Sequence, residues 1–176
     1  ASYPEVIFYG MVLLHVGVKN LVGGLHGRLF RNLPNFRYTS RFHEQIDYQN
    51  TKIVFSQLEG VKILHYGNID PDKVKQKLIN RDIPILERMR AEEGLSIWHL
   101  DCLARKYMRV YQTKKAEECY AEILDKLSPY LMDGNPPEDL FWIPSLLHLL
   151  GMQYFEQKDY ETARLLCQRG LEWCPN

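Results

Sequence analysis

The sequence predicts an α+β protein in which a β-rich N-terminal part precedes an all-helical remainder. Up to about Tyr66 the chain carries short runs of apolar, aromatic and β-branched residues bounded by turn signals, which is typical of strands. From Asp70 onward, apolar residues recur at the spacing of an amphipathic helix. Similar helical segments then repeat towards the C-terminus. We therefore expect two domains, residues 1–69 and 70–176.

The composition is that of a folded domain with an apolar core. The 176 residues are 45% hydrophobic and 25% charged, and 22 Lys and Arg balance 22 Asp and Glu. This balance argues against non-specific nucleic-acid binding, which depends on an excess of basic residues. No apolar run reaches the roughly 18 residues of a membrane span. The four cysteines lie apart in helical sequence, so we expect buried free thiols in a reducing cytoplasm.

Four segments of the N-terminal part are expected to be strands. EVIFYGMVLLHVGV (residues 5–18) is rich in β-branched and aromatic residues. LHGRLFRN (25–32) follows a Gly-Gly turn signal, FRYTSRFHEQI (36–46) follows a Pro/Asn turn, and VKILHYG (61–67) comes last. The chain enters apolar sequence directly at Ala1, and we interpret it as a fragment of a longer protein.

The helical part begins with a clear start signal. Asp70 is suited to cap a helix and Pro71 to occupy its first position. Pro84 should kink this helix or split it in two. Beyond Gly94 we expect helix throughout, except for a break at SPYLMDGNPPED (128–139). The helical apolar stripe after Pro71 consists of Val74, Leu78, Leu86 and Met89.

Two windows of the helical part share one pattern. LDCLARKYMRVYQTKKAEECYAEI from Leu100 and LHLLGMQYFEQKDYETARLLCQRG from Leu147 align at a constant offset of 47 residues. The aligned pairs are Leu100 and Leu147, Leu103 and Leu150, Ala104 and Gly151, Tyr107 and Tyr154, Ala116 and Ala163, and Tyr120 and Cys167. The order of large apolar, Leu, small, Tyr, Ala and closing Pro175 resembles the tetratricopeptide (TPR) repeat.

The TPR resemblance implies paired helices that approach closely at their small residues. It also implies a concave groove for a peptide or protein partner, although such helices can instead support the rest of an enzyme or join its subunits. Stable stacking needs about three repeats, so we expect the helix from Pro71 to supply the missing layer.

Basic residues accumulate in the predicted strands. No Asp or Glu occurs from Val6 to His43. Guanidinium groups bind phosphate through two parallel hydrogen bonds, so this block suits an anionic ligand. The alternative is that Arg simply occupies solvent-facing strand positions. The basic residues of the block are Lys19, Arg28, Arg31, Arg37 and Arg41.

Four motifs in order carry a resemblance to a known enzyme family. RLFRN (28–32), RFHEQI (41–46), ILHYGN (63–68) and KVKQKLINRDIPILE (73–87) resemble the C-terminal part of family-2-type glycosyltransferases, which are inverting enzymes of the GT-A fold. TPR repeats commonly follow in that group. The resemblance runs from about Arg28 to the end of the chain and implies a β-rich remnant of a GT-A-like domain.

The resemblance implies transfer of a sugar from a nucleotide-sugar donor to an acceptor. Glu44 resembles the general base that acts on the acceptor hydroxyl. A divalent metal, Mn or Mg, would bind the donor diphosphate, and His65 resembles its protein ligand near the end of the domain. Arg28, Arg41 and His43 would bind substrate. The alternative for His65 is a hydrogen bond to backbone at a strand end.

Two features oppose a complete active site in this chain. In a regular strand His43 and Glu44 face opposite sides, so they share a site only where the strand ends or bulges. The upstream nucleotide-binding half with its Asp-x-Asp metal motif is absent, since the literal match at Asp70-Pro71-Asp72 is a helix start. We therefore expect this chain alone to be inactive in sugar transfer.

The rival hypothesis is a TPR protein–protein interaction module with no catalytic role, capped by the N-terminal strands. A stand-alone metal hydrolase would need more convergent carboxylates than these strands offer. Strands that lack their sheet partners expose edges, which favours homodimerisation or strand exchange.

Overall fold

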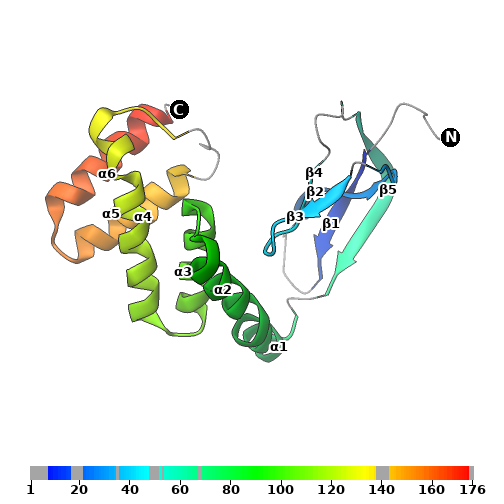
Figure 1. Cartoon of the computed structure of the whole chain (residues 1–176), viewed down its shortest axis with the longest axis horizontal. Helices are drawn as coiled ribbons and strands as arrows, with labels where there is room; N and C mark the ends of the chain where they lie inside the picture. The colour runs from blue at the N-terminus through cyan, green and yellow to red at the C-terminus, as the bar shows by residue number, and fades with distance from the viewer. Residues whose placement is uncertain are drawn as a thin grey trace. The chain divides into compact units, whose positions relative to one another are not determined.

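The computed structural model describes residues 8–16, 22–34, 36–47, 52, 54–66, 69–137 and 143–174. It is mixed α+β, with a small sheet in the N-terminal part followed by helices, as the sequence predicts (Figure 1). The chain divides into two compact units, Ala1–Ile85 and Leu86–Asn176, each of which is described by itself. The last strand ends at His65 and the first helix starts at Pro71, on either side of the expected boundary at 69/70. The division between the two compact units comes later, between Ile85 and Leu86, within a helix.

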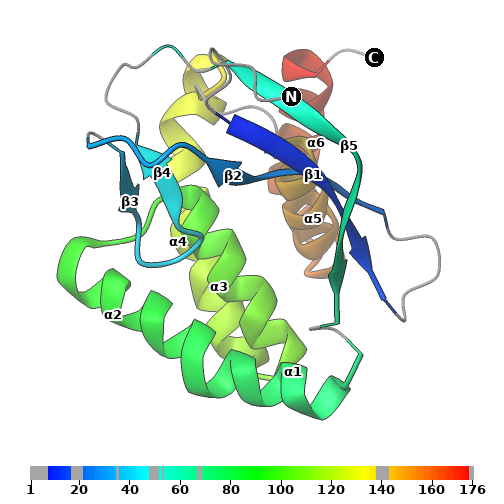
Figure 2. The same cartoon turned by 90° about the vertical axis from the view of Figure 1, so that its right-hand side faces the viewer.

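A three-stranded sheet forms the centre of the first unit. Strand β1 (Phe8–His15) lies between β2 (Val22–Phe30) and β5 (Phe55–His65), as Figure 2 shows. β1 pairs antiparallel with β2 and parallel with β5. A parallel partner needs a long connection, and the chain between β2 and β5 supplies it.

Both pairings contain an irregularity. Along β2, Leu29 pairs with Tyr9 and Gly27 with Gly10, so Arg28 is the extra residue of a β-bulge. Along β5, the register jumps between Gln57 and Lys62, and Gly60 has a φ of 74° in this stretch. Glycine can adopt this left-handed backbone conformation without strain.

The expected single strand at 36–46 is wrong. The structure has two short antiparallel strands, β3 (Arg37–Thr39) and β4 (Gln45–Asp47), joined by the loop 40–44. Ser40 and His43 have φ angles of 67° and 54°, which no strand accommodates. The Ser40 hydroxyl donates to the carbonyl of Phe42 at 2.6 Å and holds the turn.

Aromatic rings join this hairpin to the sheet. Phe8, at the start of β1, stacks on Phe30 and Phe36 with centroid distances of 5.4 and 5.9 Å. Tyr38 meets Phe30 edge-on at 6.0 Å. Offset and edge-on pairs of this kind each add stability beyond the area they bury, so the Phe8 end of β1 is the apolar centre of this small sheet.

The first helical segment starts and breaks where the sequence indicates. Helix α1 (Pro71–Lys77) is capped by Asp70, whose Oδ1 accepts from the backbone N–H groups of Asp72 and Lys73 at 3.0 and 3.2 Å. A π-helical segment, η1 (Leu78–Asp82), separates α1 from α2 (Ile83–Glu93) directly before Pro84. Pro84 has no N–H to donate, and the wider turn accommodates this loss. The sequence predicts a kink or a split at Pro84, and the structure shows an interruption of the α-helix by a π-helical segment, with no non-helical residue between α1 and α2.

Two helical hairpins make up most of the second unit. Helix α3 (Ile97–Arg109) pairs with α4 (Thr113–Asp133), and α5 (Ile143–Glu156) pairs with α6 (Tyr160–Trp173). The offset of 47 residues seen in the sequence maps the end of α3 on the end of α5 and the start of α4 on the start of α6. Within the described residues, no helix combines the length and apolar character that crossing a bilayer requires.

The turns inside the two hairpins are alike in detail. Tyr111 and Lys158 occupy the same turn position and have φ angles of 62° and 64°. In one turn Gln112 N–H donates to the Tyr107 carbonyl at 2.9 Å, and in the other Asp159 N–H donates to the Tyr154 carbonyl at 3.0 Å. The hairpins are thus a repeat in conformation as well as in sequence.

The aligned apolar residues form the hairpin cores. Leu100, Leu103 and Ala104 are fully buried on α3, and their counterparts Leu147, Leu150 and Gly151 are buried on α5. A Cβ at Gly151 would lie 3.3 Å from the Cys167 sulfur and 3.9 Å from the Ala163 carbonyl oxygen. Only a very small residue lets α5 and α6 approach this closely.

Helix α4 is longer than predicted. Residues 128–133, expected as the start of a break, are helical even though they include Pro129. Leu127 and Leu131 stay buried on either side of Pro129. The end of α4 is held from α6, because Arg169 donates to the Leu131 carbonyl and the Trp173 indole N–H to the Gly134 carbonyl, both at 2.8 Å.

The four cysteines are free thiols, but they are not all buried. Cys119 is buried, Cys102 and Cys174 are half-buried, and Cys167 is exposed, so the expectation of four buried thiols is wrong for Cys167. Burial raises the pKa of the Cys102 and Cys119 thiols to about 11, which keeps both protonated and unreactive near neutral pH.

The part of α2 after Leu86 is tied to the first hairpin by polar contacts. The Tyr107 hydroxyl donates to Glu87 at 2.5 Å, and Lys115 approaches the same carboxylate at 3.1 Å. Arg90 pairs with Glu122 of α4 at 2.5 Å. These contacts attach the part of α2 after Leu86 to α3 and α4, while the expectation that the helix from Pro71 supplies a third repeat layer stays a prediction.

We expect Leu103→Ala to lower the free energy of unfolding of the helical unit by about 2–5 kcal/mol, because it leaves a cavity beside a residue with no exposed surface. Leu171→Ala is the matched control: Leu171 is 72% exposed and its truncation should cost less than about 0.5 kcal/mol. Urea titrations followed by circular dichroism measure both. Equal losses in the two variants would contradict the described core.

We expect Tyr107→Phe to destabilise the chain by about 1 kcal/mol at pH 7, since it removes a hydrogen bond to a partly solvated carboxylate. The Tyr107 hydrogen bond, followed by Lys115, lowers the pKa of Glu87 below the ordinary 4.5. Its contribution is therefore present above pH 4.5 and is lost as the pH falls through the lowered value. The difference in free energy of unfolding between the unchanged chain and Tyr107→Phe should narrow in acid. Urea titrations at several pH values measure it, with Tyr160→Phe as a control at an exposed position. A gap that is independent of pH would argue against the Tyr107–Glu87 bond.

Candidate functional site

Three of the predicted site residues lie in the loop between β3 and β4. Arg41, His43 and Glu44 are all exposed there. The His43 ring meets the Phe42 ring edge-on, with centroids 4.4 Å apart. Because β3 ends at Thr39, the strand alternation that would separate His43 from Glu44 does not apply. The loop can present both side chains to one ligand.

Arg28 occupies the β-bulge of β2 described above, and its side chain lies outside the described part of the structure. Bulges change the direction of the side chains that follow them and are common near functional sites. The assignment of Arg28 to substrate binding stays a prediction.

His65 ends β5 and meets a second histidine. His15 is its register partner at the end of β1, and the two Nδ1 atoms lie 3.1 Å apart. The rings are nearly perpendicular, with centroids 5.0 Å apart. One imidazole can donate to the other at this distance, with the tautomers set accordingly. The described partner of the His65 side chain is therefore a second side chain, whereas the alternative considered from the sequence was a bond from this ring to backbone. The His65 main-chain carbonyl separately accepts from Val16 N–H at 3.0 Å.

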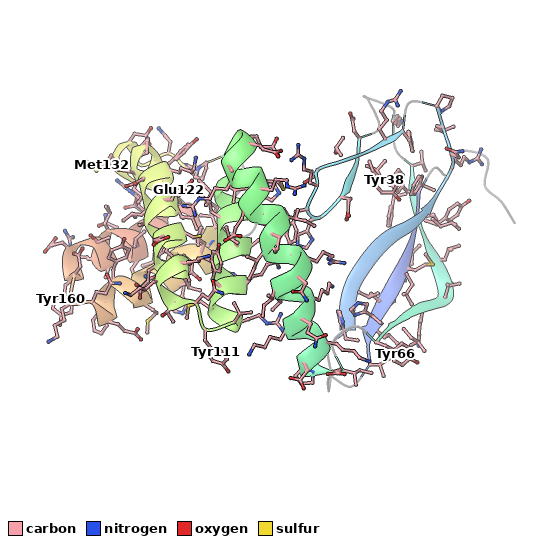
Figure 3. The ribbon with its side chains drawn as sticks, turned by 60° about the horizontal axis from the view of Figure 1, so that its bottom comes forward. Tyr38, Tyr66, Tyr111, Glu122, Met132 and Tyr160 are labelled. Carbon is pink, nitrogen blue, oxygen red and sulfur yellow. The ribbon has the colours of Figure 1, made fainter. Side chains whose placement is uncertain are left out.

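No described contact brings Glu44 and His65 together. The aromatic contacts attach the β3–β4 hairpin to the Phe8 end of β1, whereas His65 lies at the His15 end of the same strand. Figure 3 shows Tyr38 and Tyr66 at opposite ends of the sheet. Within this unit the candidate base and the candidate metal ligand belong to separate places.

The donors at the His65 end are a poor match for magnesium. Mg²⁺ takes oxygen ligands in a near-octahedral arrangement, and the described donors that converge here are imidazole nitrogens. Across the described ranges, no cluster of three or more His, Cys, Asp or Glu side chains is placed to hold an ion. The Mn or Mg that the resemblance implies would need ligands from elsewhere.

The helical unit contains a separate hollow of about 610 Å³ between α3, α4 and α5. Its floor is partly apolar, with Met108 and Met152 about half exposed. Tyr111, which ends the first hairpin turn in Figure 3, is 84% exposed beside α4. The lining residues are Arg105, Met108, Arg109, Thr113, Glu117, Tyr120, Leu149, Met152, Gln153 and Glu156.

Some polar side chains that line this hollow have hydrogen-bond partners among the described residues and others do not. Arg105 is engaged by the Asp101 carboxylate through Nε contacts of 2.8 and 2.9 Å. In contrast, Gln153 Oε1 is buried and has no hydrogen-bond partner among the described residues. A buried acceptor without a donor costs free energy, so Gln153 is a polar position of the lining that the described residues leave unsatisfied. Burial also raises the pKa of Tyr120, which keeps its hydroxyl neutral.

Sequence reasoning missed His15 and the residues of the hollow. A signal for His15 was present, since MVLLH and VKILH both place a histidine after an apolar run. It becomes informative only once β1 and β5 are known to pair in parallel. The hollow had a weaker signal, because its lining residues fall at polar or mixed positions of the repeat.

In comparisons with known proteins, no protein-family model matches the chain, and no curated protein matches it.

Proposed function

We propose that the chain is the C-terminal part of a nucleotide-sugar-dependent glycosyltransferase of family-2 type, with acceptor-side strands and a TPR-like helical extension. The observation that supports this most is where the motifs fall. RLFRN runs past the end of β2, RFHEQI spans the β3–β4 loop, and ILHYG runs past the end of β5. Ligand-contacting residues concentrate at such strand ends and loops.

In this proposal Glu44 is the general base. An exposed carboxylate on a short loop can reach an acceptor hydroxyl and take its proton as the sugar is transferred. The guanidinium of Arg41, with that of Arg28, would hold the anionic diphosphate by charge-assisted hydrogen bonds. His43 lies beside the base and would orient the acceptor. No step is assigned to a metal, because the described residues do not supply a fitting oxygen site.

The chain by itself is proposed to be inactive, since it lacks the nucleotide-binding half. Incubation of this chain with nucleotide-sugars should give no transfer above a buffer control, measured by release of nucleoside diphosphate. Turnover by the isolated chain would contradict this point. The sequence encoded upstream of Ala1 should supply strands, helices and an Asp-x-Asp motif.

In the full-length enzyme, Glu44→Gln should lower kcat by about 10²–10⁴-fold, the usual contribution of a positioned base. Glu59→Gln, a matched change at an exposed position of β5, should leave kcat within twofold. His65→Ala should alter the metal dependence of the reaction. Unchanged kinetics in both Glu44→Gln and His65→Ala would remove these assignments while leaving the family proposal open to the upstream sequence.

A second candidate function is supported by the hollow. The helical unit could act as a TPR-like interaction module that binds an extended peptide segment between α3, α4 and α5. Met108, Leu149 and Met152 offer apolar contact, and Gln153 is a polar residue of the lining. Arg109 and Glu156, at equivalent positions of the two hairpins, supply opposite charges at the rim.

A displayed library of random peptides tests this candidate. Peptides selected on the chain should bind at least about tenfold more weakly to Met152→Glu, which places a charge on the apolar floor. Met132→Glu is the control, because Met132 lies at the far end of α4 (Figure 3) and is 75% exposed. Failure to select any peptide, or equal loss in both variants, would contradict a binding role for the hollow.

A further inference from the structure

We propose that His15 and His65 together form a two-histidine binding site for a zinc-type transition-metal ion at the adjoining ends of β1 and β5. The inference rests on the approach of the two Nδ1 atoms to 3.1 Å. It goes beyond sugar transfer: it concerns a borderline metal and a residue, His15, that the resemblance leaves without a role. It holds for this chain whatever lies upstream.

The backbone holds the two histidines in place. Leu13 pairs with Ile63, Leu14 with Leu64 and His15 with His65, so three successive pairs are in regular parallel register. The pairing continues beyond them, since Val16 N–H donates to the His65 carbonyl at 3.0 Å. Register partners on adjacent strands project their side chains from the same face. Because the backbone already holds the two side chains next to each other, metal binding has little conformational entropy to remove.

The separation of the nitrogens suits two ligands of one ion. Zinc–imidazole bonds measure about 2.0–2.1 Å, so nitrogens 3.1 Å apart subtend an angle of ~98° at the metal. That angle lies between the right angle of octahedral and the wider angle of tetrahedral coordination. The outer torsion of histidine is broad, so modest ring rotation aims both lone pairs at a shared point. Both rings bind as neutral imidazoles through Nδ1, so the ring that donates in the hydrogen bond changes tautomer and carries its proton on Nε2.

The donor atoms select the class of metal. Imidazole suits Zn²⁺, Ni²⁺ and Cu²⁺, whereas Mg²⁺ and Ca²⁺ prefer carboxylate, carbonyl and water oxygens. Among the described residues the site offers two protein ligands, so we expect water to occupy further coordination positions and the affinity to be moderate. A bound ion would fasten the end of β5 to the end of β1.

Titration with metal salts tests the site directly. Calorimetry should show one Zn²⁺ ion that binds more tightly than any other Zn²⁺ on the chain. Mg²⁺ at the same concentrations should give no heat of binding. Removing even an outer-shell partner of a metal usually costs 10–100-fold in affinity. His15→Gln and His65→Gln should therefore each weaken the tightest site at least about tenfold, while His148→Ala, an exposed change on α5, should leave it unchanged.

A second measurement uses the unmodified chain, so that a variant that fails to fold does not decide the matter. Substoichiometric Co²⁺ should broaden or shift the imidazole NMR signals of His15 and His65 before those of His99 and His148. The proposal is overturned if His15→Gln folds and keeps the affinity for Zn²⁺, or if Co²⁺ affects His148 as early as His65. Equal binding of Mg²⁺ and Zn²⁺ would also overturn it.

Discussion

The helical unit depends on the close approach of paired helices at one small residue in each hairpin. A Cβ at Gly151 on α5 would make a tight contact of 3.3 Å with the Cys167 sulfur, and Ala104 occupies the equivalent buried position on α3. With the backbones this close, Leu103 and Leu150 become fully enclosed and the same turn closes both hairpins. The hollow lies between the first hairpin, α3 and α4, and helix α5 of the second, and polar residues such as Gln153 are part of its lining.

The first unit is organised by a different kind of constraint. Its sheet depends on the parallel pairing of β1 with β5, two segments separated by the whole β2–β4 region. Contacts between distant parts of the chain carry a larger closure entropy than those within a hairpin. The aromatic cluster around Phe8 stabilises one end of this pairing, and the two histidines adjoin at the other. The sheet is therefore apolar where the hairpin joins it and polar where β5 ends.

Local signals in the sequence were sufficient for much of the fold. The Asp70 cap, the interruption near Pro84 and the repeat offset all act over a few residues or within one hairpin, so they were predictable. The misses have longer-range causes. The strand expected at 36–46 is interrupted by left-handed residues that are not glycine, and the end of α4 remains helical where the Leu131 carbonyl accepts from Arg169 of α6. For the candidate site, the sequence indicated Glu44 and His65, but only the strand order reveals His15 beside His65 and the separation of Glu44 from both.

The capture of the α4 carbonyls by α6 has a consequence for how the protein is made. Arg169 and Trp173 bind the last turn of α4, yet they are synthesised well after it. While the chain emerges from the ribosome, that turn beyond Pro129 must rely on water and on its own apolar contacts. Its final docking therefore waits for α6, and the two hairpins become one cooperative structure only after that helix has emerged.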